Sequence, residues 1–165
     1  MASSPKQIGL SREAWGPRFW SILHRLTECS GKQEGPISNN DEADAWNILL
    51  RVQAFVMPCQ LCKEHYLEWY NSHKPDRLRF LVGEERRTWL RHWLWGCHDR
   101  VNRTTNKASP PEDQLPSLYP KQSIQKEIVE LGMMYQLAQT KELLKHDEIV
   151  RWKQVVARLR TMYGI

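Results

Sequence analysis

Hydrophobic residues recur every three or four positions through most of this chain, and no segment alternates convincingly between apolar and polar residues. That period is typical of helices with one buried face. The first such stretch carries Trp15 and Leu26 on one face, with Ser11 before it and Gly31 after it. These signals predict a first helix that ends in a loop at the glycine.

Two more helices are predicted before the middle of the chain. Asn40 is expected to cap the second helix, because the acidic residues at positions 41, 42 and 44 suit the positive end of a helix dipole. Its apolar face continues to about Val56. Pro58 suits the start of a third helix, which is expected to begin at Cys59 and to run to about Tyr70.

The second half of the chain continues the helical pattern. Residues 73–83 are expected to form a loop, and residues 84–104 a fourth helix. The proline-rich stretch 109–120 is expected to be irregular, and two further helices are predicted over 122–145 and 147–162. The predicted fold class is therefore all-α, a four-helix bundle followed by a C-terminal helical extension.

Composition narrows the range of functions. The chain has 165 residues and a net charge of +5, without a block of five or six like charges, so its charge does not indicate nucleic-acid binding. Eight tryptophans are unusual for this length, and such flat aromatic surface either fills a core or lines a site for a flat ligand. The sequence contains neither the G-x-G-x-x-G nor the Walker A nucleotide motif.

Whether the four cysteines are reduced or paired depends on the cellular compartment of the protein. The N-terminus lacks the apolar core of a secretory signal, and no run of 18 apolar residues occurs, so we expect an intracellular location. Thiols normally stay reduced there, and a close cysteine pair then requires a catalytic or metal-binding explanation.

Pro58-Cys59-Gln60-Leu61-Cys62 is the strongest local signal. Two thiols three residues apart at a helix start can close a disulfide, and the free backbone N–H groups there favour a thiolate. A thioredoxin fold is not expected, because the strands are missing. The alternative is a zinc-stabilised helical binding module that uses Cys59 and Cys62 as metal ligands. Cys29 and Cys97 stand alone in the sequence, so the remaining ligands would be an irregular set drawn from His24, His65 and His98.

Three predicted helices also place functional side chains at spacings that share one face. Trp20 and His24 are four residues apart on the first helix, Cys59 and Cys62 are three apart on the third, and His98 and Asn102 are four apart on the fourth. Lys107 follows the fourth helix. Each residue alone is more simply explained as core filler or as a helix end. Together, on facing helices around a cysteine pair, they could stack on, hydrogen-bond to and neutralise a buried cofactor.

Three motifs resemble those of the Erv/ALR family of FAD-dependent sulfhydryl oxidases. The run from Trp15 to His24 resembles the family's WGPxxWxxLH opening, and the PCxxC at 58–62 resembles its active site. His65 corresponds to a histidine often found in viral members. The C-terminal extension and the WGPxxW opening favour a viral origin. The run from Trp93 to Lys107 is similar to the family's W-x4-H-N-x-V-N-x2-L-x-K block. The motifs occur in the family's order and spacing.

The resemblance implies a flavin site in the bundle core, with the FAD ring beside the cysteine pair. A substrate thiolate would attack Cys59, and Cys62 would pass electrons to the flavin, which O2 would reoxidise to give H2O2. The positions that correspond to cofactor contacts are Trp15, Gly16, Trp20, His24, His65, Trp93, His98, Val101, Asn102, Lys107 and Tyr119.

The same resemblance sets expectations for organisation and partners. Residues 1–14 would be an N-terminal segment, 15–120 the oxidase domain and 121–165 a C-terminal helical extension. The substrates would be protein thiols, with a thioredoxin-like or viral redox partner as one expected source, and the chain would form a homodimer through a face that the sequence does not locate. A cytoplasmic location is expected, in the host cell or the virion if the protein is viral.

The chain departs from the family pattern at several positions. Asp99 stands where the family has asparagine, Thr105 replaces a leucine, and Trp95 occupies the position of a frequent structural cysteine. No second, shuttle cysteine pair is visible. Cys29 and Cys97 could form a pair or act as a shuttle, but we expect buried free thiols.

Residues 151–160 form a basic amphipathic segment with Trp152, Val156 and Leu159 on its apolar face. Such a helix can bind a membrane surface or a partner. We expect it instead to pack this face on the bundle.

Overall fold

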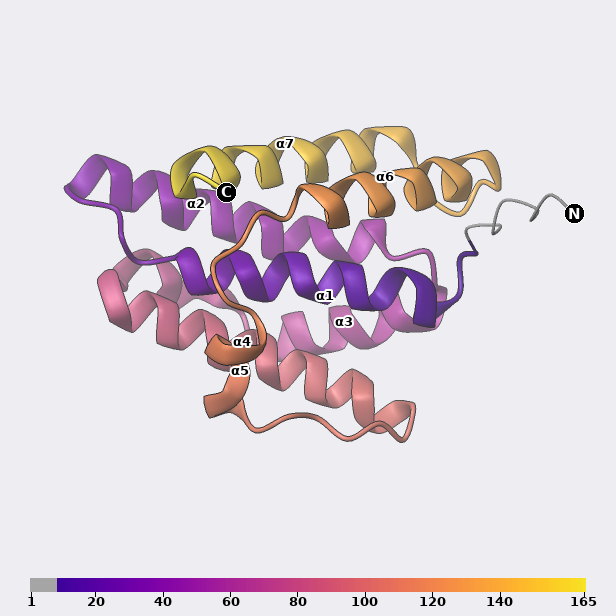
Figure 1. The fold of residues 1–165 in the computed structure, drawn as a ribbon, viewed down its shortest axis with the longest axis horizontal. Coiled ribbons are helices and arrows are strands. Elements are labelled where there is room, and N and C mark those ends of the chain that lie inside the picture. The colour runs from indigo at the N-terminus through magenta and orange to yellow at the C-terminus, as the bar shows by residue number, and fades with distance from the viewer. Residues whose placement is uncertain (1–8) are drawn as a thin grey trace, which may run out of the picture.

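A computed structural model describes residues 9–165, and every regular element in that part of the chain is helical (Figure 1). The all-α prediction is confirmed. The elements are α1 (Arg12–Cys29), α2 (Pro36–Val52), η1 (Gln53–Val56), α3 (Gln60–Ser72), η2 (Pro75–Phe80), α4 (Gly83–Thr104), η3 (Glu112–Gln114), α5 (Leu115–Leu118), α6 (Gln125–Thr140) and α7 (His146–Tyr163). None of the described helices is both long and apolar enough to cross a membrane.

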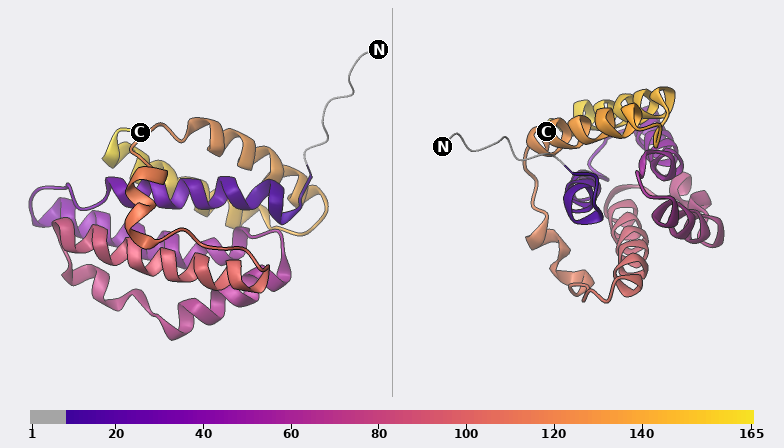
Figure 2. Two further views of the ribbon diagram at one scale, coloured as in Figure 1. Left: turned by 60° about the horizontal axis from the view of Figure 1, so that its bottom comes forward. Right: turned by 90° about the vertical axis from the view of Figure 1, so that its right-hand side faces the viewer.

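Helix α1 lies at the centre of the molecule. It packs against α4 on one side and against α6 on the other, while α2 packs against α7 and α3 against α4. Seen along the bundle, α6 and α7 form a layer over the other long helices (Figure 2). One continuous core runs through both parts. The segment after residue 120 is therefore part of the same packed body as the bundle.

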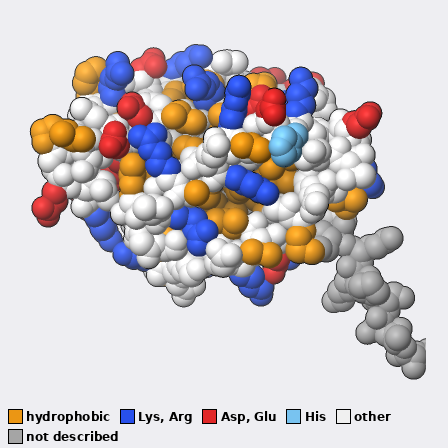
Figure 3. Space-filling model, turned by 90° about the horizontal axis from the view of Figure 1, so that it is seen from above, with side chains coloured by type: hydrophobic (Ala, Val, Ile, Leu, Met, Phe, Trp, Pro, Cys, Tyr) orange, Lys and Arg blue, Asp and Glu red, His pale blue; other side chains and the backbone are white. Residues whose placement is uncertain are grey.

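The apolar face of α7 packs inward, as the sequence predicts. Trp152, Val156 and Leu159 are each no more than 2% exposed. Basic side chains point outward, and from above the α6 and α7 layer shows Lys and Arg interspersed with hydrophobic side chains (Figure 3). The prediction that this helix docks on the bundle is confirmed.

Several predicted boundaries are wrong. Helix α2 begins at Pro36 after Gly35 in a left-handed conformation (φ 81°), so Asn40 lies inside the helix instead of capping it. Proline is well suited to the first helical turn, which explains the earlier start. The predicted loop 73–83 contains η2, the stretch 109–120 contains η3 and α5, and α6 is shorter than the predicted 122–145.

A buried polar cluster joins α7 to the bundle. Glu42 of α2 pairs with Arg86 of α4, and both side chains are fully buried. The Tyr163 hydroxyl donates to Glu42 and accepts from Trp46 Nε1 at 2.8 Å, and the Gly31 N–H donates to Glu42 at 2.9 Å. Tyr163, from the end of the chain, and Gly31 both donate to Glu42, which stabilises the buried carboxylate, while Arg86 Nε has no partner within residues 9–165.

Candidate active site

The cysteine pair lies at the N-terminus of α3. Cys59 is the N-cap residue of the helix, and its Sγ accepts a hydrogen bond from the backbone N–H of Cys62 at 3.2 Å. The two residues form a disulfide, with their Cα atoms 5.2 Å apart. Because the first N–H groups of a helix lack partners within it and carry the positive end of its dipole, a thiolate on Cys59 is stabilised there.

The two sulfurs differ in access. Cys62 is buried, with 3% of its surface exposed, while Cys59 is half-buried at the surface. Access and the helix terminus both favour Cys59 as the sulfur that an outside thiolate attacks. Cys62 points into the molecule and lines a pocket.

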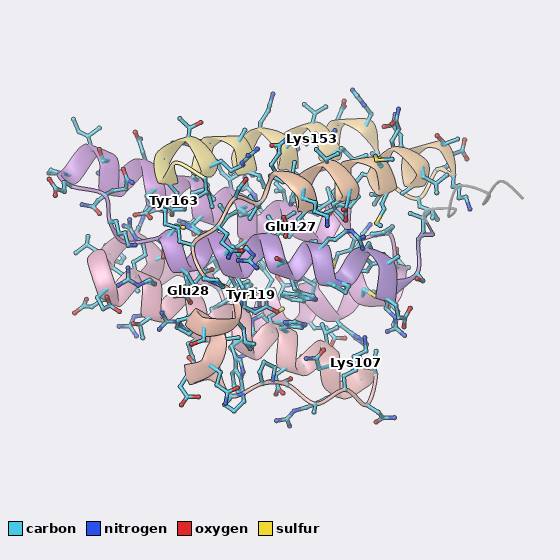
Figure 4. All side chains as sticks on the ribbon, viewed as in Figure 1. Glu28, Lys107, Tyr119, Glu127, Lys153 and Tyr163 are labelled. Atoms are coloured by element: carbon cyan, nitrogen blue, oxygen red, sulfur yellow. A yellow bond between two sulfur atoms is a disulfide. The ribbon has the colours of Figure 1, made fainter. Side chains whose placement is uncertain are left out.

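This pocket has a volume of about 380 Å³, within the range of small-molecule sites. The start of α1, Cys62, the end of α4 and the segment after α4 surround it. The described lining residues are Arg12, Trp15, Gly16, Pro17, Trp20, Cys62, His98, Val101, Asn102, Thr105, Lys107 and Tyr119. Figure 4 shows Lys107 on the loop after α4 and Tyr119 nearer to α1.

Aromatic and imidazole rings form one wall of the pocket. The rings of Trp20 and His98 stack with centroids 4.1 Å apart and planes 6° apart. His24 lies next to His98, with its Nε2 3.2 Å from His98 Nδ1, and its ring stacks on that of Tyr119 at 4.6 Å. Stacked rings from α1, α4 and the segment after α5 thus give a rigid, flat surface.

Burial sets the charge of the two histidines. It lowers the pKa of His24 to about 3, with a further contribution from His98, and the pKa of His98 to about 4, with Lys107 adding to the effect. Both rings are therefore neutral at pH 7. A neutral imidazole has one donor and one acceptor nitrogen, so one ring donates to the other across the 3.2 Å contact.

The pocket also carries polar groups, which come from the start of α1 and from the end of α4 with the loop that follows it. Trp15 Nε1 is buried and has no hydrogen-bond partner among residues 9–165. The Asn102 side-chain amide donates to Ser109 Oγ at 3.0 Å, and the Lys107 backbone N–H donates to the Asn102 carbonyl at 2.9 Å. Asn102 thus holds the turn that carries Lys107, while Trp15 presents an unused donor.

Most of the residues nominated from the sequence meet at this pocket. Trp15, Gly16, Trp20, His98, Val101, Asn102, Lys107 and Tyr119 line it, and His24 lies directly behind His98.

Two nominated residues lie elsewhere. Trp93 does not line the pocket; its Nε1 donates to the His73 carbonyl at 2.6 Å, and its ring packs among those of Trp69 and Trp89. His65 lies on α3 three residues after Cys62 and does not line the pocket either. For Trp93 the sequence contained a signal, because five residues between Trp93 and His98 place them about 140° apart around α4.

Three lining residues lie outside the predicted set of cofactor contacts. Arg12, Pro17 and Thr105 also border the pocket. Arg12 lies four residues before Gly16 on α1, and this spacing on one helix face was the available signal. Thr105 was noted only as a departure from the family pattern.

A metal site at the cysteine pair finds no support in the structure. Within residues 9–165 no cluster of three or more His, Cys, Asp or Glu side chains is placed to hold a metal ion. Cys29 and Cys97 are both buried free thiols, as expected, and burial raises the pKa of each. They neither complete a zinc site nor offer reactive thiolates.

The fold and the site together define an all-helical protein with a disulfide between solvent and an aromatic pocket. The sequence model of the Erv1 / Alr family matches residues 17–128, and the chain belongs to this family. Its members are in general FAD-linked sulfhydryl oxidases. A comparison with curated proteins and one with solved structures each return no match. Helix α7 lies outside the matched range, and the viral origin stays a prediction.

Proposed function

We propose that this protein is an FAD-dependent thiol oxidase that converts protein dithiols to disulfides, with O2 as the final electron acceptor and H2O2 as its product. One observation carries the proposal. The Cys59–Cys62 disulfide has one sulfur within reach of solvent and the other on the wall of a pocket built from flat rings. A disulfide placed in this way can take electrons from outside and release them inside.

The residues present fit FAD. The Trp20–His98 stack offers a flat surface against which a flavin ring can lie. The unpartnered Trp15 Nε1 offers a donor for a polar edge of the ring. Lys107 and Arg12, both on the pocket lining, would neutralise the diphosphate. Because His24 and His98 are both uncharged at pH 7, the ring wall to which they belong adds no positive charge to the site.

The chain's own chemistry begins with a substrate thiolate that attacks Cys59 Sγ. The Cys59–Cys62 bond breaks, Cys62 leaves as a thiolate, and a mixed disulfide joins Cys59 to the substrate. A second substrate thiolate attacks the substrate sulfur of that bond, forming the substrate disulfide and releasing Cys59 as a thiolate. The substrate has then lost two electrons and two protons, and the cysteine pair has gained the two electrons. The Cys62 N–H and the helix terminus stabilise Cys59 as that leaving group.

Bound FAD would supply a two-electron acceptor for the reduced pair that can pass electrons to O2. The burial of Cys62 supports this division of roles, because it keeps the inner sulfur away from substrate thiols. We also propose that substrates react directly with Cys59, since Cys29 and Cys97 are buried. Protein thiols are the proposed substrates, and the proposed assembly is a homodimer.

The test is a visible spectrum of the purified protein, followed by oxygen consumption with dithiothreitol. We expect a bound flavin and one H2O2 for each disulfide formed. Cys59→Ala should abolish turnover and keep the flavin, because Cys59 does not line the pocket. A colourless protein that holds stoichiometric zinc would refute the proposal, and so would a flavoprotein without thiol-dependent oxygen uptake.

A further inference from the structure

A second hollow, of about 480 Å³, lies between α2 and α7. Its apolar residues are Ile48 and Val52 of α2, Phe55 of η1 and Val155 of α7. The α2 side runs over about 10 Å from Ile48 to Phe55, which is room for about three residues of an extended chain. We call this hollow the α2–α7 groove. It is distinct from the pocket beside Cys62, with which it shares no lining residue.

The groove is basic. Three arginines, Arg51, Arg151 and Arg158, line it together with one carboxylate, Glu148, so these four residues give the lining a net charge of +2. Arg151 lies 3.9 Å from Glu148, and Arg158 lies 3.7 Å from Asp41. Such long pairs between partly exposed side chains are weak, so the guanidinium groups remain available to an anionic ligand.

One end of the groove adjoins the reactive cysteine. Phe55 is 39% exposed and precedes Cys59 by four residues, a stretch that cannot exceed about 14 Å between Cα atoms. Lys63 connects the two, since its Nζ lies 5.9 Å from the Phe55 ring centre and its backbone N–H donates to the Cys59 carbonyl at 3.0 Å. Leu61, in the first turn of α3, is 54% exposed. Apolar surface thus flanks Cys59, and basic surface continues from it along the groove.

We infer that the α2–α7 groove binds a segment of the substrate protein next to its reactive cysteine, a segment with apolar side chains near the cysteine and acidic ones further along. This inference rests on the proposed function. The acidic part of the segment is inferred from charge complementarity, because arginines outnumber carboxylates on the lining of the groove. Exposed Phe55 and Leu61 select the apolar part. Helix α7 provides one wall and lies outside the family match, so the groove comes from this chain's own extension.

The test uses two dithiol peptides with the same cysteine pair and an adjacent leucine, one carrying two glutamates and the other two lysines. We expect the acidic peptide to be oxidised with about ten-fold higher kcat/KM at low ionic strength, and salt to reduce the difference. The double variant Arg51→Glu/Arg151→Glu should remove or invert this preference and leave dithiothreitol turnover unchanged. Arg79→Glu, an exposed arginine of η2, is the matched control and should keep the preference.

A second readout does not require turnover. Binding is measured by fluorescence anisotropy with fluorescently labelled versions of the two peptides in which serine replaces both cysteines. The acidic peptide should bind more tightly, and the double variant should lose this difference in affinity. Normal dithiothreitol turnover with equal use of both peptides would overturn the groove assignment and keep the proposed oxidase. Charge-selective binding without any turnover would support the groove and refute the oxidase. Self-association that the double variant abolishes would assign the groove to a second copy of the chain and overturn the inference.

Discussion

Removal of a single hydroxyl, in Tyr163→Phe, should destabilise the whole protein. This hydroxyl donates to Glu42, accepts from Trp46 Nε1 at 2.8 Å, and belongs to a side chain that is 6% exposed. Burial and Glu42 raise the pKa of Tyr163, so the hydroxyl remains a donor throughout the usual pH range. The substitution keeps the ring and deletes only these two hydrogen bonds.

The expected cost follows from the two groups left behind. A hydrogen bond to a charged acceptor contributes about 1.5–3 kcal/mol, and a buried N–H without a partner costs about 1–3 kcal/mol. Local relaxation recovers part of the sum, so we expect the free energy of unfolding to fall by about 3 kcal/mol. For a chain of this size that corresponds to a decrease in Tm of roughly 6–12 °C.

Tyr135→Phe is the matched control. Tyr135 is also fully buried, and its ring packs edge-on against Trp152 at 5.3 Å, but its hydroxyl has no hydrogen-bond partner within residues 9–165. Removing an unpaired buried hydroxyl should leave stability unchanged or raise it by up to about 2 kcal/mol.

Urea unfolding followed by tryptophan fluorescence, with circular dichroism as a second probe, measures both variants. The decisive quantity is the difference between Tyr163→Phe and Tyr135→Phe. Equal losses in the two variants would refute the polar cluster as the anchor of α7, because burial of the ring is common to both.

Three further predictions concern the site. Cys62→Ser should displace thionitrobenzoate from a substrate peptide whose single cysteine carries it as a disulfide, and should keep the peptide as a mixed disulfide on Cys59, detected as a mass increase that dithiothreitol removes, since no inner thiol remains to release it; failure to trap would contradict Cys59 as the accessible sulfur. Stability should fall as the pH decreases from about 6.5 towards 4, because the pKa of His24 lies at about 3 and that of His98 at about 4 while the unfolded rings protonate first. Urea unfolding at pH 7 and pH 5 checks this, and replacing both histidines with glutamine should flatten the slope. Lys107→Glu should weaken FAD binding about ten-fold in equilibrium titration, and unchanged affinity would remove Lys107 from the diphosphate site.

The sequence predicts the long helices well, because their apolar faces repeat at one period over many residues. Helix α4 illustrates this, since its observed range differs from the predicted 84–104 by one residue. The first residue of α2 is harder to predict from the sequence, because Pro36 and Asn40, with its acidic neighbours, both signal a helix start. The local sequence does not show which of two possible start signals begins the helix when both residues fit within it.

The site was predictable as far as shared helix faces allow. Trp20, His98 and Cys62 meet at one pocket because each lies on the inward face of its own helix. Trp93 and His98 are five residues apart on α4, which places them about 140° apart around the helix, and the Trp93 ring packs against Trp69 instead. Which helix faces which side chain depends on packing across the whole bundle, and a single sequence does not contain that information directly.

The same limit hid the role of the C-terminal segment. A buried Glu42–Arg86 pair lies outside what hydrophobic periodicity can predict, because charged residues normally indicate a solvent-exposed face. The partner that completes the pair, Tyr163, comes from more than a hundred residues further along.

Helix α7 therefore has two physical roles that must be tested separately. It closes the core through Tyr163 and Trp152, and it supplies the wall of the α2–α7 groove that carries Arg151. Deleting α7 would expose buried apolar surface and unfold or aggregate the protein, so loss of substrate preference in a truncated chain would say nothing about the groove. Surface charge reversal leaves the buried face intact, because Arg151 is exposed while Trp152 is not. Substrate preference that changes in Arg51→Glu/Arg151→Glu at unchanged stability would separate recognition by this helix from its contribution to the fold.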